Sequence, residues 1–336
     1  MIPMLLTAVL IFFKWAFIVL LVMLLAGIIF EQYSRRKLER NIRKGKTFAA
    51  INGHQIHYVK KGKGNCTVIF ESGLASDHMI WKEVQDEIAK DAVTLSYDRS
   101  GMFLSEAGDF VKTNESIANE LTQLAELTHC PKPYIIVGHS IAGIYIRPFI
   151  ASHLQDMAGI VLVDASHPMQ LKRSSAKLKK ANGTLPLGLI KIMMETGIFR
   201  LLFTFIPFSA EIPVNHRFHR IFKDFFYKSY RTVFLEAAND TLNFQDAGKY
   251  TSFGHIPLTV ITGISPVRYA HIKDAALQQE YQELAEELHS DLLGLSTNNR
   301  LVKATKSGHI IQVQESGLIA EEIRRILLLN SHCSKL

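Results

Sequence analysis

The chain has 336 residues, of which 48% are hydrophobic and 21% charged, enough apolar sequence to bury a core and exclude global disorder. Its formal net charge is +7, but the excess lies in separate clusters without a recognised binding motif, so nucleic acid is not an expected partner. The three cysteines, Cys66, Cys130 and Cys333, are too few and too widely spaced for a disulfide scaffold, and no Cys/His cluster has the spacing of a structural zinc site. We therefore expect neither disulfide bonds nor a metal to hold the fold together.

An apolar stretch opens the chain. Lys14 is the only charged residue before Glu31, and residues 15–30 are apolar throughout. A helix needs about 20 apolar residues to cross a hydrocarbon core, so the span must also use residues 11–13 while Lys14 extends toward the headgroups. A cleaved secretory signal would place positive charge before a shorter apolar stretch and a small-x-small site after it, and neither is found. We predict an uncleaved transmembrane anchor over residues 1–30.

Basic residues follow the anchor and form a juxtamembrane neck, which we assign to residues 31–47. Residues 31–50 contain seven Lys/Arg against two Glu, whereas residues 51–336 are nearly balanced, with 30 basic and 29 acidic residues. Because Lys and Arg are enriched in cytoplasmic flanks, the neck predicts a single-pass protein whose folded domain lies on the cytoplasmic side. The chain ends in Ser-Lys-Leu (residues 334–336), a peroxisomal address in a eukaryote, and the anchor makes that location the minor alternative.

Short β-rich runs alternate with stretches of helical periodicity after the neck. This alternation indicates an α/β fold with a mostly parallel, eight-stranded sheet flanked by helices. The first two strands of the sheet are expected to form a hairpin. Several runs, such as YIIV, are unbroken and apolar, as is typical of strands covered on both faces. The expected strands are 48–52, 56–60, 67–71, 93–97, 134–137, 160–163, 258–262 and 301–304, and the expected helices are 78–90, 113–128, 141–154, 273–294 and 316–329.

Residues 169–255 interrupt the alternation with helical, aromatic and basic sequence. We predict a helical cap, or lid, inserted between two parts of the core, residues 48–168 and 256–336. Within residues 199–234, 11 Phe or Tyr are interleaved with Arg and Lys. Such a stripe can form the interior of the cap, or some of its rings can line an acyl pocket or meet lipid. The candidate pocket residues are Phe203, Phe218, Phe222 and Phe226.

A serine between small residues lies on an expected strand-to-helix turn. The strand over residues 134–137 runs into the sequence GHSIAG, and an apolar helix follows. A sharp turn at this point can hold the hydroxyl of Ser140 exposed near the helix amides. The arrangement resembles the nucleophile elbow of the α/β-hydrolase family, although Ala142 replaces the second glycine of the G-x-S-x-G pattern. A serine in an ordinary strand-to-helix turn is the alternative.

Other stretches between about residues 48 and 330 resemble the same family. The sequence ESGL (residues 71–74) ends the third strand where members often carry His-Gly-x, and YDRSG (residues 97–101) follows the fourth strand as in many of them. The resemblance implies an oxyanion hole formed by the amides of Leu74 and Ile141. The charged pair in YDRSG is expected to brace loops rather than to react.

A serine nucleophile needs a base, and the family resemblance identifies it. His309, in the sequence KSGH, follows the last strand where the family carries its catalytic histidine; a solvated loop histidine is the alternative. The seventh strand, after which most members place their acid, is followed by no carboxylate before Asp274. Asp164 ends the sixth strand, from which some relatives orient their histidine. We favour Asp164 over Asp274, with a helix cap or loop tie as its alternative role.

The resemblance implies a membrane-anchored serine hydrolase that cleaves an acyl ester through Ser140, His309 and Asp164 and an acyl-enzyme intermediate. The expected partners are a small acyl ester or lipid substrate and the membrane, with no cofactor, metal or obligate protein partner. Thioesters and amides share this mechanism. A non-catalytic binding or scaffold protein of the same fold is the alternative, favoured by Ala142, the altered residues 71–74 and the missing acid after the seventh strand.

Overall fold

The structure is a computed structural model that describes residues 2–108, 111–183, 186–331 and 333. A central eight-stranded sheet has the order β1-β2-β4-β3-β5-β6-β7-β8. β2 runs antiparallel to β1 and β4, and all neighbours from β4 to β8 are parallel, which confirms the predicted mostly parallel sheet. All eight expected strands form, as β1 (Thr47–Ile51), β2 (His54–Lys61), β3 (Thr67–Glu71), β4 (Val93–Tyr97), β5 (Tyr134–His139), β6 (Met157–Val163), β7 (Leu258–Gly263) and β8 (Asn299–Ala304).

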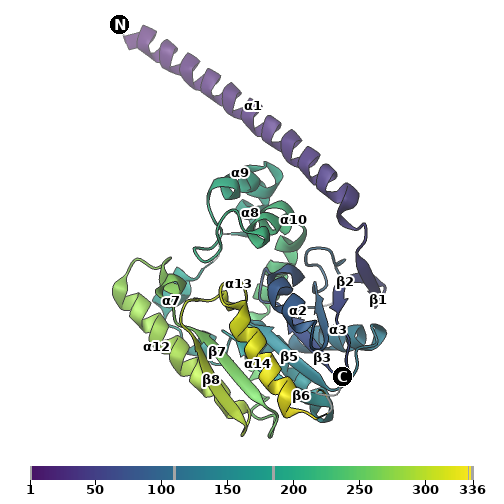
Figure 1. The fold of residues 1–336 in the computed structure, drawn as a ribbon. Helices are drawn as coiled ribbons and strands as arrows, with labels where there is room; N and C mark the ends of the chain where they lie inside the picture. Colours follow the sequence, from purple (N-terminus) through teal and green to yellow (C-terminus); the bar gives the residue numbers. More distant parts are fainter. Residues whose placement is uncertain (1, 109–110, 184–185, 332, 334–336) are drawn as a thin grey trace.

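Helices cover both faces of the sheet because its central strands are apolar on both sides (Figure 1). Successive strand residues point to opposite faces, so Val68 and Phe70 pack with α2 and α14, whereas Ile69 packs with α3 and α5. The expected helices form, some of them in two pieces. They are α2 (Lys82–Ile88), α3 (Asn114–Leu127), α4 (Ala142–Tyr145), α5 (Arg147–Ser152), α12 (Ala275–Leu292) and α14 (Ser316–Leu329). A short helix that was not expected, α13 (Ile311–Gln314), precedes α14.

In the described part of the chain, six helices lie between β6 and β7, where the insertion was predicted. We call these six helices the cap; α8, α9 and α10 lie between the sheet and the N-terminal helix, whereas α7 lies beside α12 (Figure 1). The cap has an aromatic interior in which Phe199, Phe222 and Phe226 stack on one another, with Met194 beside them. Its helices are α6 (Gln170–Arg173), α7 (Ala176–Ala181), α8 (Leu187–Glu195), α9 (Ile198–Phe205), α10 (Arg217–Ala238) and α11 (Asp240–Ala247).

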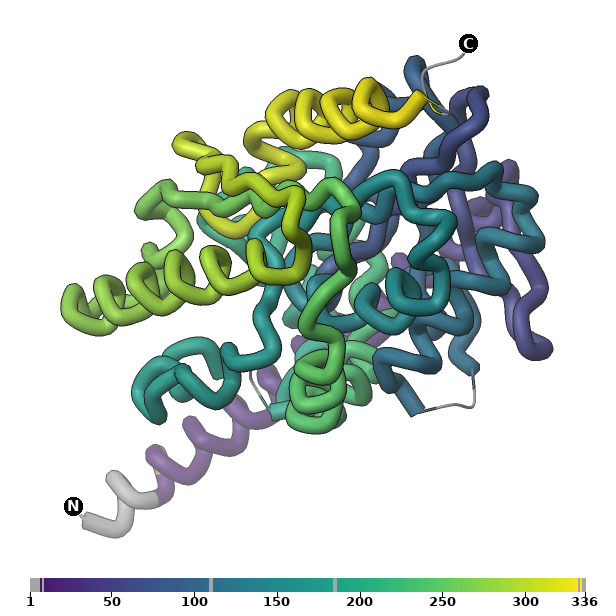
Figure 2. Tube along the Cα trace, turned by 90° about the horizontal axis from the view of Figure 1, so that it is seen from below, coloured from purple at the N-terminus to yellow at the C-terminus, as the bar shows by residue number. Residues whose placement is uncertain are grey.

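The apolar N-terminus and most of the basic neck form one helix, α1 (Ile2–Ile42). Its part from Val9 to Ile42 has the length and apolar composition of a membrane span, features that a signal sequence would share. Figures 1 and 2 both show its N-terminal part extending beyond the rest of the molecule. The Ser-Lys-Leu sequence lies outside the described residues.

A disulfide bond joins Cys66 to Cys333, with Cα atoms 5.2 Å apart, so the expectation that no disulfide holds the fold was wrong. The two cysteines are separated by 267 positions in sequence and become neighbours in the fold, where α14 packs against α2 and β6. Cys130 is buried and its thiol is free. Disulfides persist in oxidising compartments, whereas the basic neck favours a cytoplasmic domain, so the two indications of orientation are opposed.

Replacing Cys333 tests what this cross-link contributes. Relative to disulfide-bonded wild type, the Cys333→Ser variant should lose about 2–4 kcal/mol of unfolding free energy, because its unfolded chain is no longer held in a long loop. Thermal unfolding with and without reductant measures the effect, and reduced wild type should match the variant. Identical midpoints for wild type and variant without reductant would contradict a stabilising disulfide.

Candidate active site

Ser140 occupies a strained turn between β5 and α4. Its φ is +57°, in the left-handed region that usually requires glycine. The turn is tight on both sides: a Cβ on Gly138 would lie 3.3 Å from the Cβ of Ala142, and one on Gly143 would lie 2.8 Å from the Cβ of Ala165. The small residues at 138 and 143 therefore provide the space that the turn needs, and Ala142 fits beside them.

The turn brings Ser140 to the histidine predicted from the far end of the chain. Ser140 Oγ lies 3.0 Å from His309 Nε2 across 169 sequence positions, and His309 Nδ1 lies 2.5 Å from Asp164 Oδ2. Asp164 is buried at the end of β6, while the side chain of His309 is 38% exposed. The other candidate acid, Asp274, is not at this site, because it caps the N-terminus of α12 by accepting the N–H groups of Ala276 and Leu277.

Arg268 lies where most family members would supply the acid. Its guanidinium pairs with Asp164 Oδ1, which also accepts the Gly263 N–H at 3.1 Å. Burial raises the pKa of the Asp164 carboxyl. The charge of Arg268, the hydrogen bond from His309 and nearby His289 outweigh that effect and bring the pKa well below its usual range. Asp164 therefore stays ionised at neutral pH, with one oxygen held in place and the other free to orient His309.

Glu211, between α9 and α10, holds the histidine loop from the cap side. Its buried carboxylate accepts the backbone N–H groups of His309 at 2.9 Å and of Ile310 at 2.8 Å. A Cβ on Gly308 would lie 2.9 Å from the Glu211 carboxyl carbon, so only glycine allows this approach. Sequence reasoning missed Glu211, because nothing local distinguishes it from the other acidic residues of the chain.

His139, beside the nucleophile, also holds the loop that carries His309. Its Nε2–H donates to the backbone carbonyl of His309 at 2.9 Å. Burial lowers the pKa of His139 to about 3, so the ring is neutral and the acceptor fixes its tautomer. This contact gives His139 a structural role at the base of the histidine loop.

The two amides implied for an oxyanion hole come from adjacent segments. Ile141 follows the nucleophile at the start of α4, and Leu74 lies in the loop after β3. That loop lies directly against the turn, since a Cβ on Gly73 would be 2.9 Å from His139 Nδ1 and 3.1 Å from the Ser140 Cβ. Leu74 and Ile141 thus lie in the two segments that meet at Ser140, and the role of their amides stays a prediction.

Arg99 braces this loop, as expected for the charged pair after β4. Its guanidinium donates to the carbonyls of Ser72 at 2.6 Å and Gly73 at 3.1 Å. Two buried carboxylates balance its charge: Glu71 at 2.6 Å and Glu236 of α10 at 2.9 Å. The loop after β3 is therefore tied to the cap as well as to the sheet.

A cavity of about 130 Å³ opens beside Ser140, between α6, α7 and α12. Among the described residues, the lining of this cavity contains none of the four phenylalanines expected in a substrate pocket, so their contact with substrate stays a prediction. Phe203, Phe222 and Phe226 pack in the cap interior and Phe218 in the main core, because a cap of short helices needs its rings for its own packing. The cavity is lined by Ser140, Asp164, Ala165, Ser166, Gln170, Ser174, Leu178, Asn182, Arg268, Tyr281, Leu284, Ala285, Leu288, His289 and His309.

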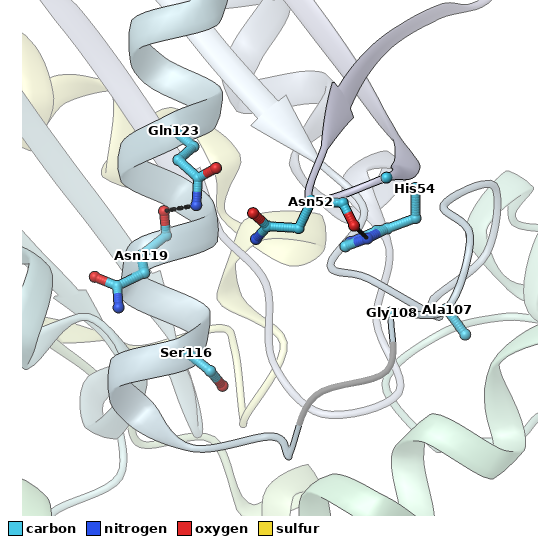
Figure 3. A pocket seen from close by; sticks show the side chains of 8 residues that line it. Asn52, His54, Ala107, Gly108, Ser116, Asn119 and Gln123 are labelled. Atoms are coloured by element: carbon cyan, nitrogen blue, oxygen red, sulfur yellow. Dashed lines mark hydrogen bonds between the residues drawn. The ribbon is translucent and has the colours of Figure 1, made fainter.

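A second cavity, of about 490 Å³, lies between the β1–β2 turn and α3 (Figure 3). Within the described ranges, it shares no lining residue with the cavity beside Ser140. This hollow is therefore separate from the serine and the histidine that the sequence predicts to react. The lining residues are Asn52, Gly53, His54, Ala107, Gly108, Ser116, Asn119 and Gln123.

Among the described residues, one group of three side chains could offer ligands to a metal: His57, His78 and Asp98. Asp98 accepts from His57 Nδ1 at 2.9 Å and from His78 Nδ1 at 2.8 Å. These are hydrogen-bond distances, and they engage both carboxylate oxygens and one nitrogen of each ring. The arrangement thus functions as a buried hydrogen-bonded network that holds the segment after β4.

Comparisons with known proteins agree with the fold. A family model described as "Alpha/beta hydrolase family" matches residues 68–322. An "AB hydrolase superfamily protein" of Gibberella zeae is 25% identical over 291 residues, which cover 78% of this chain and 86% of that protein.

Solved structures show the same fold at low sequence identity. A variant of the Vigna radiata epoxide hydrolase superposes with a TM-score of 0.63 at 15% identity, over 85% of this chain and 98% of that one. The enol-lactonase from Burkholderia xenovorans LB400 superposes with a TM-score of 0.60 at 16% identity, over 84% and 100% of the two chains.

Removing the Glu211 carboxylate should loosen the histidine loop. Glu211→Ala leaves two buried N–H groups without their acceptor and should lower the unfolding free energy by about 1.5–3 kcal/mol. Glu211→Gln keeps one oxygen and should lose less, while Glu321→Ala, an exposed acid on α14, is the matched control. Denaturant unfolding gives the values; equal midpoints for Glu211→Ala and Glu321→Ala would refute the role of Glu211.

Proposed function

The chain belongs to the α/β-hydrolase family, and from that premise we propose that it is a membrane-anchored serine hydrolase that cleaves an acyl ester. The observation that carries the proposal is the hydrogen-bonded series from Ser140 through His309 to Asp164. A hydroxyl, an imidazole and a carboxylate in this order are the groups that activate serine for attack on a carbonyl.

The geometry supports a two-stage mechanism. His309 Nε2 takes the proton from Ser140 Oγ as that oxygen attacks the acyl carbonyl, and Asp164 stabilises the imidazolium and fixes its tautomer. The amides of Leu74 and Ile141 would stabilise the tetrahedral oxyanion. His309 then donates its proton to the departing alcohol. In the second stage His309 deprotonates a water molecule, which attacks the acyl-enzyme, and the released Ser140 recovers its proton.

Ester hydrolysis is the reaction that we propose among those found on this fold. Epoxide opening would call for a carboxylate nucleophile at the elbow, and Ser140 offers a hydroxyl. Thioesters and amides would proceed through the same acyl-enzyme and are alternative substrates. The departures at Ala142 and residues 71–74 favour a second candidate, a non-catalytic binding or scaffold protein of the same fold.

We propose that α1 anchors the enzyme as a single span. Support comes from its apolar side chains, which are exposed along the helix from Val9 to Phe30. Because of the basic neck, we still predict that the catalytic domain lies on the cytoplasmic side. The Cys66–Cys333 bond is the observation against this prediction, because disulfides persist in oxidising compartments. Mass analysis of the thiols in freshly isolated membranes decides between them: free thiols at both positions support the cytoplasmic side.

Covalent labelling tests whether the chain is an enzyme or a scaffold. A fluorophosphonate should modify wild type at Ser140, because the activated oxygen displaces fluoride, and should leave Ser140→Ala unmodified. His309→Ala should react on the order of 10³-fold more slowly, since the base is gone. Peptide mass spectrometry locates the adduct; a wild-type Ser140 that does not react favours the scaffold.

Separate replacement of the two candidate acids tests the triad assignment. Asp164→Asn should lower kcat by on the order of 10⁴-fold, because the amide favours the wrong imidazole tautomer. Asp274→Asn should leave kcat within about twofold, since Asn caps a helix as well as Asp. Steady-state hydrolysis of a short activated ester provides the rates, and equal small losses in both variants would exclude Asp164 as the orienting acid.

A further inference from the structure

The outer surface of the cap carries an unusual amount of exposed apolar side chain. On α9 and just after it, Leu201 is 64% exposed, Phe205 74% and Ile206 51%. On α8, Ile192 is 58% exposed. Soluble surfaces expose such residues singly, and a cluster on two consecutive helices marks an interaction site. We call the exposed apolar residues of α8 and α9, with Ile206, the cap face.

The cap face continues the apolar surface of α1. A groove of about 650 Å³ separates the two and has walls from both. Its lining is mostly apolar, and Figure 1 shows α8 and α9 beside the middle of α1. The lining residues are Leu20, Met23, Leu24, Ala26, Gly27 and Phe30 of α1, with Thr196, Gly197, Ile198, Arg200, Leu201, Thr204 and Lys223 of the cap.

Close backbone packing fixes the cap against α1. A Cβ on Gly27 would lie 2.3 Å from the Thr196 carbonyl oxygen, and one on Gly197 would lie 3.0 Å from the Gly27 carbonyl oxygen. Gly197 also has a φ of +75°, which joins α8 to α9 through a conformation that other residues resist. The two glycines thus allow a close contact that fixes the position of α9 along the axis of α1.

A buried ionic cluster sets the same register at the polar end of the contact. Glu31, the first acidic residue after the apolar stretch, pairs with Arg200 of α9 at 2.7 Å and with Arg35 at 2.8 Å. Arg200 also pairs with Asp224 of α10 at 2.6 Å. These bonds place the start of α9 level with Glu31, where the apolar sequence of α1 ends.

The register places the groove at the depth of the hydrocarbon layer. At 1.5 Å per residue, Leu20 lies about 16 Å along α1 from Glu31, toward the interior of a bilayer that α1 crosses. Leu201 shares the groove with Leu20, and side chains that line one groove with the span meet the same surroundings as the span itself. Of the two basic residues in the lining, Arg200 is paired with Glu31, and Lys223 can extend to the headgroups.

On this basis we infer that the cap face is embedded in the acyl layer of the bilayer alongside α1, so that the enzyme acts on ester substrates drawn from the membrane. The inference rests on the proposed function for its substrate, and on α1 as a span for its depth. The interior of the cap, beneath the cap face, reaches the site, because Leu74 packs against the cluster that contains Met194 and Phe199.

Depth-dependent quenching in the full chain tests the embedding. Cysteines introduced at Leu201 or Phe205 carry an environment-sensitive fluorophore, in nanodiscs that contain lipids with a quencher on the acyl chain. Leu25→Cys on α1 reports the span, and Leu127→Cys and Leu242→Cys are controls at similarly exposed leucines on α3 and α11. Labelling of the unmodified chain checks that Cys130 and the disulfide do not react.

We expect quenching at 201 and 205 to approach that at 25 and to exceed that at 127 and 242 several-fold. Quenching at 25 with none above the controls at 201 and 205 would overturn the inference while leaving the anchor intact. Apolar fluorescence at 201 without lipid quenching would indicate a second copy of the chain on the cap face and would also overturn it. No quenching at 25 would remove both the anchor and the inference.

Activity on a membrane-held ester and on a water-soluble ester tests whether the cap face delivers substrate from the bilayer. Leu201→Asp should lower hydrolysis of a long-chain ester held in vesicles at least several-fold, because a charge in the acyl layer is costly. Its turnover of a short water-soluble ester should match wild type, and Leu242→Asp should match wild type on both. Equal loss on both esters, or no loss on either, would overturn membrane delivery of substrate without touching the triad.

Discussion

The contact between Ser140 Oγ and His309 Nε2 joins two loops that the sequence keeps 169 positions apart, and three parts of the molecule maintain it. The turn after β5 holds Ser140 in a left-handed conformation that small neighbours make possible. The end of β6 supplies Asp164, whose second oxygen is occupied by Arg268. The cap supplies Glu211, which fixes the backbone on which His309 is carried.

The cap is therefore part of the site's construction. Glu211 ties it to the histidine loop, and Glu236 ties it through Arg99 to the loop after β3. On its far side the cap is bonded to α1 through Arg200 and Glu31. Charge-assisted contacts thus join the cap to the helix that we propose crosses the membrane and, separately, to the two loops that flank Ser140.

Local patterns predicted the parts of this structure that depend on local physics. The strands followed from β-rich runs, and Ser140 from small residues at a strand-to-helix turn. Arg268, Glu211 and the Cys66–Cys333 bond could not be predicted, because their partners are distant in sequence and meet only in the folded chain. The pocket role of the cap phenylalanines stays a prediction, because the hydrophobic period of a cap interior is the same as that of an acyl pocket.

The most direct test of the central claim is the mass of the protein, quenched in acid, while it turns over an activated ester. If Ser140 is the nucleophile that His309 activates, the chain should carry a single acyl group on the peptide that contains Ser140. In a His309→Ala variant that has been acylated beforehand, the group should persist, because deacylation lacks its base. Turnover by a chain that stays unmodified, or that is acylated at another residue, would contradict the account.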